Sequence, residues 1–311
     1  MLLNKLLFSF LLMSAAAGSA FGQIVDGDGP LDRTAEQSAI FRETFRNLIA
    51  DESKTFASFG KDGNPGKRTT VKSALLIYVS KADRPAELRV VKEVDGTPIP
   101  DAAKRGEEFL AEMDRVKTDE SLLKKLEKES TRHDPTYTIY GLALHQGTVL
   151  DPWLREAFTF APAGESVIDG HRVMAFSYAQ SAPNDYVAFN SKPPDSSKPA
   201  LIFDLDLPKS VKRSDLRLFG TIWVDVETYR IRKEERGVYF DAEKSVPLLT
   251  ERFEYADSEF GILLPRSISL VFNELKRKDG KYTIRSHDSV LFEYSNYRKT
   301  NVEVKISDDD S

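Results

Sequence analysis

The sequence predicts an α+β fold in which a large antiparallel sheet packs on segregated helices. Most of the chain after residue 137 alternates apolar and polar residues in short runs, which is typical of half-buried strands. Short turns join these runs, so consecutive strands are expected to pair antiparallel. Helical periodicity is confined to two segments, rather than alternating with the strands.

The strand prediction rests on runs of β-branched and aromatic residues separated by turn signals. Five runs are predicted as strands: 71–79, 86–91, 219–224, 229–235 and 282–294. Between Ile262 and Phe272 the apolar residues share one parity, which predicts another strand. Turns are predicted at three places, namely Asp169-Gly170, 225–228 and 278–281.

Two helical segments are predicted to cover the sheet. The first opens at Thr34 with a start that resembles a capping box, and its apolar face is formed by Ile40, Phe41, Phe45, Leu48 and Ile49. The second is a helical insertion near 101–129, with an apolar stripe and a remaining face rich in Lys and Glu.

The N-terminus predicts export. Residues 1–22 combine one lysine, an apolar stretch and a small-residue exit, so we expect a signal peptide cleaved after Gly22 and a periplasmic or secreted protein. We expect a flexible lead-in over 23–33, a single domain over 34–306 and an acidic tail over 307–311. With no cysteine in the chain, N-terminal lipidation and disulfides are excluded, and no integral membrane segment is expected after signal removal.

Composition and motifs give no sign of catalysis. A formal net charge of −5 argues against nucleic acid as a partner. The four histidines, His133, His145, His171 and His287, show no metal-ligand spacing, and nucleophile-elbow and phosphate-loop motifs are absent. We therefore expect no metal, no cofactor and no enzyme activity, and keep a hydrolase assembled from distant residues as the least favoured alternative.

Aromatic residues are concentrated in the C-terminal third and allow two interpretations. Packing of the sheet explains them most simply, because aromatics favour strands and bury large areas. Alternatively, the apolar face of a curved sheet holds an apolar ligand, with helices as its lid. On that second interpretation the ligand contacts are expected to be Trp223, Tyr229, Phe253, Phe272 and Phe292.

One stretch resembles a known group of proteins. The hairpin 220–231, Gly-Thr-Ile-Trp-Val-Asp-Val-Glu-Thr-Tyr-Arg-Ile, and the later segment Gly-Ile-Leu-Leu-Pro at 261–265 resemble the periplasmic LolA/LolB-like group of outer-membrane lipoprotein-sorting proteins. The resemblance covers roughly residues 160 to 300, and its closest form is found in uncharacterised exported bacterial members. It implies an unclosed β-barrel wrapped around helices.

The resemblance also implies a function. Members of the group bind acyl chains in an apolar cavity, so we expect a non-enzymatic protein that binds or carries a lipid or a lipidated partner. The alternative from another class is an envelope module that holds a second protein through its sheet or edge strands, without a small-molecule ligand. The motifs are structural, and no ligand residue is carried over from the group.

Overall fold

The computed structural model describes residues 29–46, 48–60, 64–79, 85–102, 104, 108, 120–134, 142–191, 198, 200–240, 247–279 and 281–299. The predicted signal peptide and acidic tail lie outside these residues. So do most of the lead-in, most of the insertion before residue 120 and most of the proline-rich loop at 193–199.

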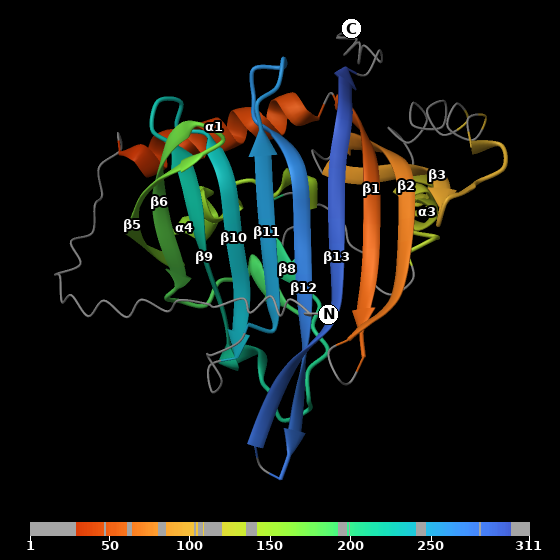
Figure 1. Cartoon of the computed structure of the whole chain (residues 1–311). Helices are drawn as coiled ribbons and strands as arrows, with labels where there is room; N and C mark the ends of the chain where they lie inside the picture. The colour runs from red at the N-terminus through yellow and green to blue at the C-terminus, as the bar shows by residue number, and fades with distance from the viewer. Residues whose placement is uncertain are drawn as a thin grey trace, which may run out of the picture.

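One antiparallel sheet of eleven strands dominates the described part of the chain (Figure 1). Its order is β4-β3-β2-β1-β13-β12-β11-β10-β9-β6-β5. The end strands β4 and β5 do not pair with each other, so the sheet is unclosed, and the predicted fold class is confirmed. The strands are β1 (Leu48–Phe59), β2 (Pro65–Val79), β3 (Pro85–Val94), β4 (Thr97–Pro98), β5 (Phe158–Ile168), β6 (His171–Gln180), β9 (Leu216–Asp225), β10 (Ile231–Phe240), β11 (Leu249–Ala256), β12 (Leu264–Lys278) and β13 (Lys281–Lys299).

The predicted turns join neighbouring strands of this sheet. Asp169 and Gly170, both with positive φ, connect β5 to β6. At the β9–β10 turn the Asp225 carboxylate accepts the backbone N–H groups of Glu227 and Thr228, each at 3.0 Å. This is the local bond by which Asp stabilises a turn. The hairpin between β12 and β13 is found where the Asp-Gly signal predicted it.

The first helix and the strand after it differ from the prediction. Helix α1 (Pro30–Phe45) begins four residues before Thr34, because Pro30 occupies its first turn and the Asp32 carboxylate accepts the Gly29 N–H at 3.3 Å. It ends at Phe45, so Leu48 and Ile49 belong to β1 instead. Ile40, predicted on the apolar face, is 49% exposed.

Short elements cover one side of the sheet, which we call its inner face (Figure 1). Helix α1 crosses this face near one end of the strands. Two connections contribute the rest of the cover. The connection from β4 to β5 contains η1 (Leu142–Leu144), η2 (Thr148–Leu150) and α4 (Pro152–Arg155), and the connection from β6 to β9 contains the parallel pair β7 (Val187–Phe189) and β8 (Leu201–Phe203), followed by η3 (Arg213–Asp215). The opposite side is the outer face.

Helix α3 (Glu120–Ser130) lies against β3, at the C-terminal end of the segment predicted as a helical insertion. Beyond the two-residue β4, the edge of β3 would expose unpaired backbone groups. The Ser130 hydroxyl accepts the Arg89 N–H at 2.8 Å, so the end of α3 covers this edge.

Candidate functional site

Helix α1 meets the inner face through an aromatic contact. Phe41 and Phe45 are each 1% exposed and lie 5.3 Å apart between ring centroids. Phe41 packs edge-on against Tyr255 of β11 at 6.0 Å, and Phe45 contacts Tyr297 of β13 at 6.1 Å. Such pairs add stabilisation beyond the area that they bury. An apolar layer therefore lies between the sheet and a single helix.

The five aromatic residues predicted as ligand contacts lie in three different places. Phe253 and Phe292 are fully buried on the inner face, and Phe272 is half-buried on the same face. Trp223 alternates with the buried Ile222 and Val224 and therefore lies on the outer face. Tyr229 has a positive φ in the β9–β10 turn, where its ring stacks 4.9 Å from the Arg33 guanidinium. Their role in ligand binding stays a prediction.

Buried charged side chains lie on the inner face of the sheet at β1, β2 and β3. Arg89 binds Glu52 through two bonds, of 2.8 and 2.9 Å, and donates a third, of 2.8 Å, to Glu87. Lys54 pairs with Asp134, which follows α3. We call these five residues the β1–β3 ionic cluster; the side chains of four of them are at most 1% exposed and that of Asp134 is 2% exposed.

The ionisation of this cluster follows from its pairing. Burial alone would raise the pKa of Glu52, but the Arg89 charge and hydrogen bonds outweigh burial, and the pKa lies below its usual value. Burial raises the pKa of Asp134 and lowers that of Lys54, each against the pull of the other. Glu52 and Arg89 therefore form the firmly charged centre of the cluster.

A second buried group, the β10–β11 ionic cluster, consists of Glu234, Arg236, Glu251 and Tyr178. Arg236 Nε donates to Glu251 at 2.6 Å, whereas its Nη1 is 3.7 Å from Glu234. Both Nη atoms of Arg236 are buried, and neither has a hydrogen-bond partner among the described residues. Glu234 accepts the Tyr178 hydroxyl at 3.2 Å. Burial raises the pKa of Glu234, only partly offset by Arg236.

Both clusters hold the cover by its backbone. Glu87 accepts the Ala143 N–H at 2.6 Å, and Glu234 accepts the Gly147 N–H at 3.1 Å. From α1, Arg42 donates to the Asp151 carboxylate at 2.6 Å. Because bonds to ionised groups are about twice as strong as neutral ones, these contacts fix the cover at discrete points.

Sequence reasoning did not find these ionic residues. Glu52, Lys54 and Phe56 share one parity of β1, and Glu234, Arg236 and Val238 share one parity of β10. Charged residues in such positions look like the solvent side of a strand. Paired charges of opposite sign at one parity were the available signal, and it is ambiguous without knowledge of the neighbouring strands.

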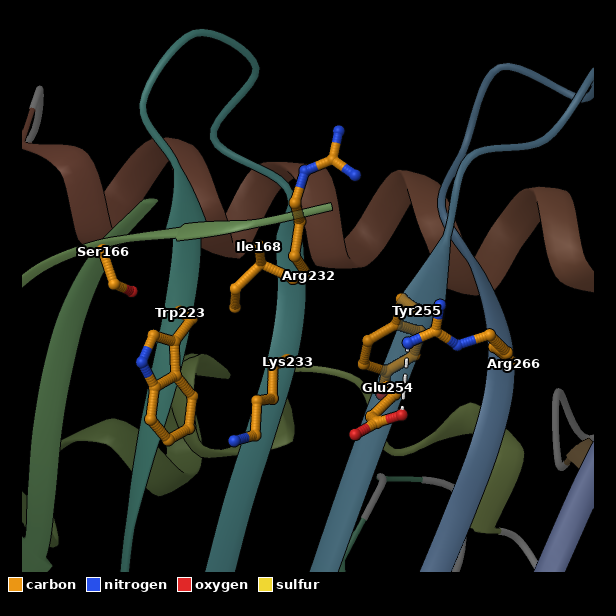
Figure 2. Close-up of a pocket in the computed structure, with 8 residues that line it drawn as sticks. All are labelled: Ser166, Ile168, Trp223, Arg232, Lys233, Glu254, Tyr255 and Arg266. Carbon is orange, nitrogen blue, oxygen red and sulfur yellow. Dashed lines mark hydrogen bonds and ion pairs between the residues drawn. The ribbon is translucent and has the colours of Figure 1, made fainter. Parts of the chain in front are cut away.

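The outer face carries a pocket of about 190 Å³ beneath the tip of the β5–β6 hairpin (Figure 2). Its lining residues come from five strands: Ser166, Ile168, Trp223, Arg232, Lys233, Glu254, Tyr255 and Arg266. The hairpin tip is held in place by polar contacts of Asp169 and His171. Asp169 lies 3.3 Å from Arg266, and His171 lies 3.4 Å from Asp225 and 3.5 Å from Asp257. We call this the outer-face pocket.

Two general features bear on the kind of site. Within the described ranges, no three His, Asp or Glu side chains are gathered in a way that would hold a metal ion. In the same part of the chain, no helix has the length and apolar character needed to span a bilayer.

Comparison with known proteins gives structural neighbours only. No family model and no curated protein sequence matches the chain. A domain described as an outer membrane lipoprotein-sorting protein from Vibrio parahaemolyticus aligns with 10% identity and a TM-score of 0.35, covering 87% of this chain and 95% of that one. A DUF1329 family protein from Desulfovibrio piger aligns with 11% identity and a TM-score of 0.34, covering 90% of this chain and 94% of that one. A LolA superfamily protein from Nitrosomonas europaea aligns with 11% identity and a TM-score of 0.31, covering 86% of this chain and 94% of that one.

Two of these neighbours carry names from the group that the sequence resembles. At such low TM-scores the likeness supports no conclusion about ligand or partner.

Proposed function

We propose that the protein is an exported, non-enzymatic carrier that holds the acyl chain of a lipid or lipidated partner between the inner face and its cover. The observation that carries the proposal is the aromatic contact of α1 with the sheet. Phe41 and Phe45 pack on Tyr255 and Tyr297, so displacement of one helix would uncover a continuous apolar surface. An acyl chain would replace these apolar contacts, while the ion pair of Arg42 with Asp151 would have to open as the helix moves.

The attachment of α1 supports the same proposal. Its polar contacts to the rest of the molecule are side-chain contacts, such as Asp32 with Arg155 and Arg42 with Asp151, while the strands beneath it hold one another through backbone ladders. The ion pair of Asp32 with Arg155 is partly exposed and contributes little. Helix α1 can therefore separate from the sheet without breaking the ladder of any strand.

The proposed absence of catalysis is supported by how the buried charges are used. Glu52, Glu87 and Arg89 bind one another, and Glu87 and Glu234 bind backbone N–H groups of the cover. Their burial is explained by these structural contacts. We further propose that 34–306 form a single domain and that 1–22 direct its export.

The test is native mass spectrometry of the full chain expressed in a bacterial periplasm, followed by titration with cis-parinaric acid. We expect a retained lipid as added mass and saturable uptake of the probe. Phe41→Ala with Phe45→Ala should loosen α1 and speed probe uptake, whereas Ile40→Ala on the exposed side of the same helix should not. Neither retained lipid nor probe uptake by the wild-type protein would contradict the proposal.

A second candidate is a protein-interaction module, and the free edge of β5 favours it. Among the described strands only β6 pairs with β5, so the other edge of β5 offers backbone groups to an added strand. Pro162 and the irregularity before Gly164 restrict this opportunity to part of the strand. A protein, rather than a lipid, recovered with the chain would favour this second function.

A further inference from the structure

We propose that the outer-face pocket binds a small organic anion, namely a carboxylate attached to one flat apolar ring. The pocket opens on the side of the sheet opposite α1 (Figure 2). It shares one residue, Tyr255, with the proposed acyl site, and the variants used below leave Tyr255 unchanged. Loss of either activity would therefore leave the other measurable.

The apolar part of the site is provided by Trp223 and Ile168. Trp223 stands on the outer face of β9, and Ile168 reaches it from the hairpin tip (Figure 2). The Lys233 ammonium lies 4.4 Å from the centroid of the Trp223 ring. The indole is thus an apolar wall with a cation beside it, which suits a ligand whose apolar ring carries an anionic group.

The charged part of the site favours an anion. Three of the lining residues are cations and one, Glu254, is an acid, although the whole chain carries a net charge of −5. Arg232 is bound by Asp225 and Asp257 and points away from the pocket (Figure 2). The ligand would therefore be bound by Lys233 and Arg266.

Both of these cations have donors to spare. Lys233 pairs with Glu235 at 2.8 Å, and Arg266 pairs with Asp169 and Glu254 at 3.3 Å each. An ammonium has three N–H donors and a guanidinium five, so these pairs leave donors for a ligand. The side chain of Arg266 is half exposed, and ion pairs of this kind are weak enough to be rearranged. Glu254 Oε2 accepts hydrogen bonds from Arg266 and from the Ser267 hydroxyl, which hold this carboxylate against β12.

The size of the site limits the ligand. Drug-sized ligands occupy roughly 300–1,000 Å³, whereas this pocket measures about 190 Å³. One ring with a carboxylate fits this volume, and an acyl chain does not.

Three probes of one shape and different charge test the proposal: benzoate, benzamide and benzamidine. The Trp153→Phe variant leaves Trp223 as the only tryptophan, so its fluorescence reports on the pocket. We expect benzoate to change this fluorescence saturably and to bind more tightly than benzamide and benzamidine. Lys233→Met keeps the apolar stem over the indole and should weaken benzoate binding roughly tenfold or more, as should Arg266→Gln. Lys276→Gln, an exposed cation on the distal part of β12, is the matched control.

A measurement on the unmodified sequence guards against variants that fold poorly. Benzoate should shift the Trp223 indole N–H resonance of the wild-type protein and leave that of Trp153 in place. Three results would overturn the proposal: tighter binding of benzamidine, benzoate binding that survives both pocket substitutions, or no shift at Trp223 at saturating benzoate.

Discussion

The β1–β3 and β10–β11 ionic clusters lie on the same inner face but pair their charges differently. In the first, Arg89 makes three bonds to two carboxylates, and only its Nη1 lacks a partner. In the second, Arg236 makes one short bond to Glu251, and both Nη atoms lack a partner. The clusters thus differ in how completely hydrogen bonds and ion pairs offset the free-energy cost of removing their charged side chains from water.

This difference reverses the direction in which the pKa of the central carboxyl group departs from its usual value. Glu52 has a lowered pKa and Glu234 a raised one, although both are fully buried. Burial alone therefore does not decide whether the pKa rises or falls; the number and geometry of the charge-assisted bonds do. We call the second cluster the softer one, because its arginine makes one hydrogen bond to a carboxylate where Arg89 makes three. The softer cluster binds the cover through Glu234 and the Gly147 N–H.

The largest effect is expected from Arg89→Met. It would leave Glu52 and Glu87 buried without their cation, which costs about 3–5 kcal/mol of unfolding free energy. Urea denaturation monitored by circular dichroism measures the loss. Adding Glu52→Met should recover part of it, and a single-variant loss below about 1 kcal/mol would contradict the description of a tightly paired cluster.

Arg236→Met should cost less, about 2–3 kcal/mol. It removes one short bond to Glu251 and a distant contact to Glu234, and it also removes two buried Nη groups that lack partners. The same denaturation experiment compares it with Arg89→Met. Equal or greater destabilisation would show that the second cluster is not the softer one.

Gly147→Ala tests the attachment of the cover to the second cluster. Gly147 has a φ of 60°, and a Cβ would contact Ser38 of α1 and lie 2.8 Å from Ile231 Cδ1. We expect a loss of about 2 kcal/mol from strain and overpacking. Gly170→Ala is the matched control, since it also has a positive φ but nothing within 4 Å of its Cβ, and should cost about 1 kcal/mol. Similar losses in the two variants would contradict close packing at Gly147.

The smallest effect is a difference in pH dependence between Glu52→Gln and Glu234→Gln. Because the pKa of Glu52 is lowered on folding, its ionised form adds to the free energy of unfolding above pH 4.5. This contribution is lost as the pH falls through the folded-state pKa. The raised pKa of Glu234 gives a cost that grows as pH rises above 4.5.

From about pH 3 to 7, Glu52→Gln should therefore lose ground to the wild type as pH rises toward 4.5, and Glu234→Gln should gain above pH 4.5. Each trend amounts to about 1.4 kcal/mol for every pH unit by which the folded-state pKa departs from its usual value. Denaturation midpoints across this range measure both trends. Parallel trends in the two variants would remove the distinction between the clusters.

Sequence patterns predicted the sheet where its inner face is apolar. The alternation at Ile268, Leu270 and Phe272 located β12, and the Asp-Gly signals located the hairpins of β5–β6 and β12–β13. The same reasoning missed β1, because Glu52 and Lys54 point inward and are neutralised by residues far along the chain. Leu48 and Ile49 then extended the helical periodicity of α1 by chance.

The candidate sites were harder to predict for a related reason. The alternation of residues along one strand separates those of its two faces, but it does not show which face is covered by the rest of the protein. Trp223 and Phe253 were grouped as one apolar surface, and only the register of β9, β10 and β11 separates them. The outer-face pocket also needs the β5–β6 hairpin to fold over β9 and β10, which no local pattern encodes.

The place of β1 in the sheet has a consequence for how the chain folds. β1 pairs with β13, so that residue 48 lies opposite residue 299. The middle of the sheet therefore cannot form until both ends of the described chain are present, and loops closed over such sequence distances fold slowly. A nascent chain would therefore lack this ladder until the last strand of the sheet has been synthesised.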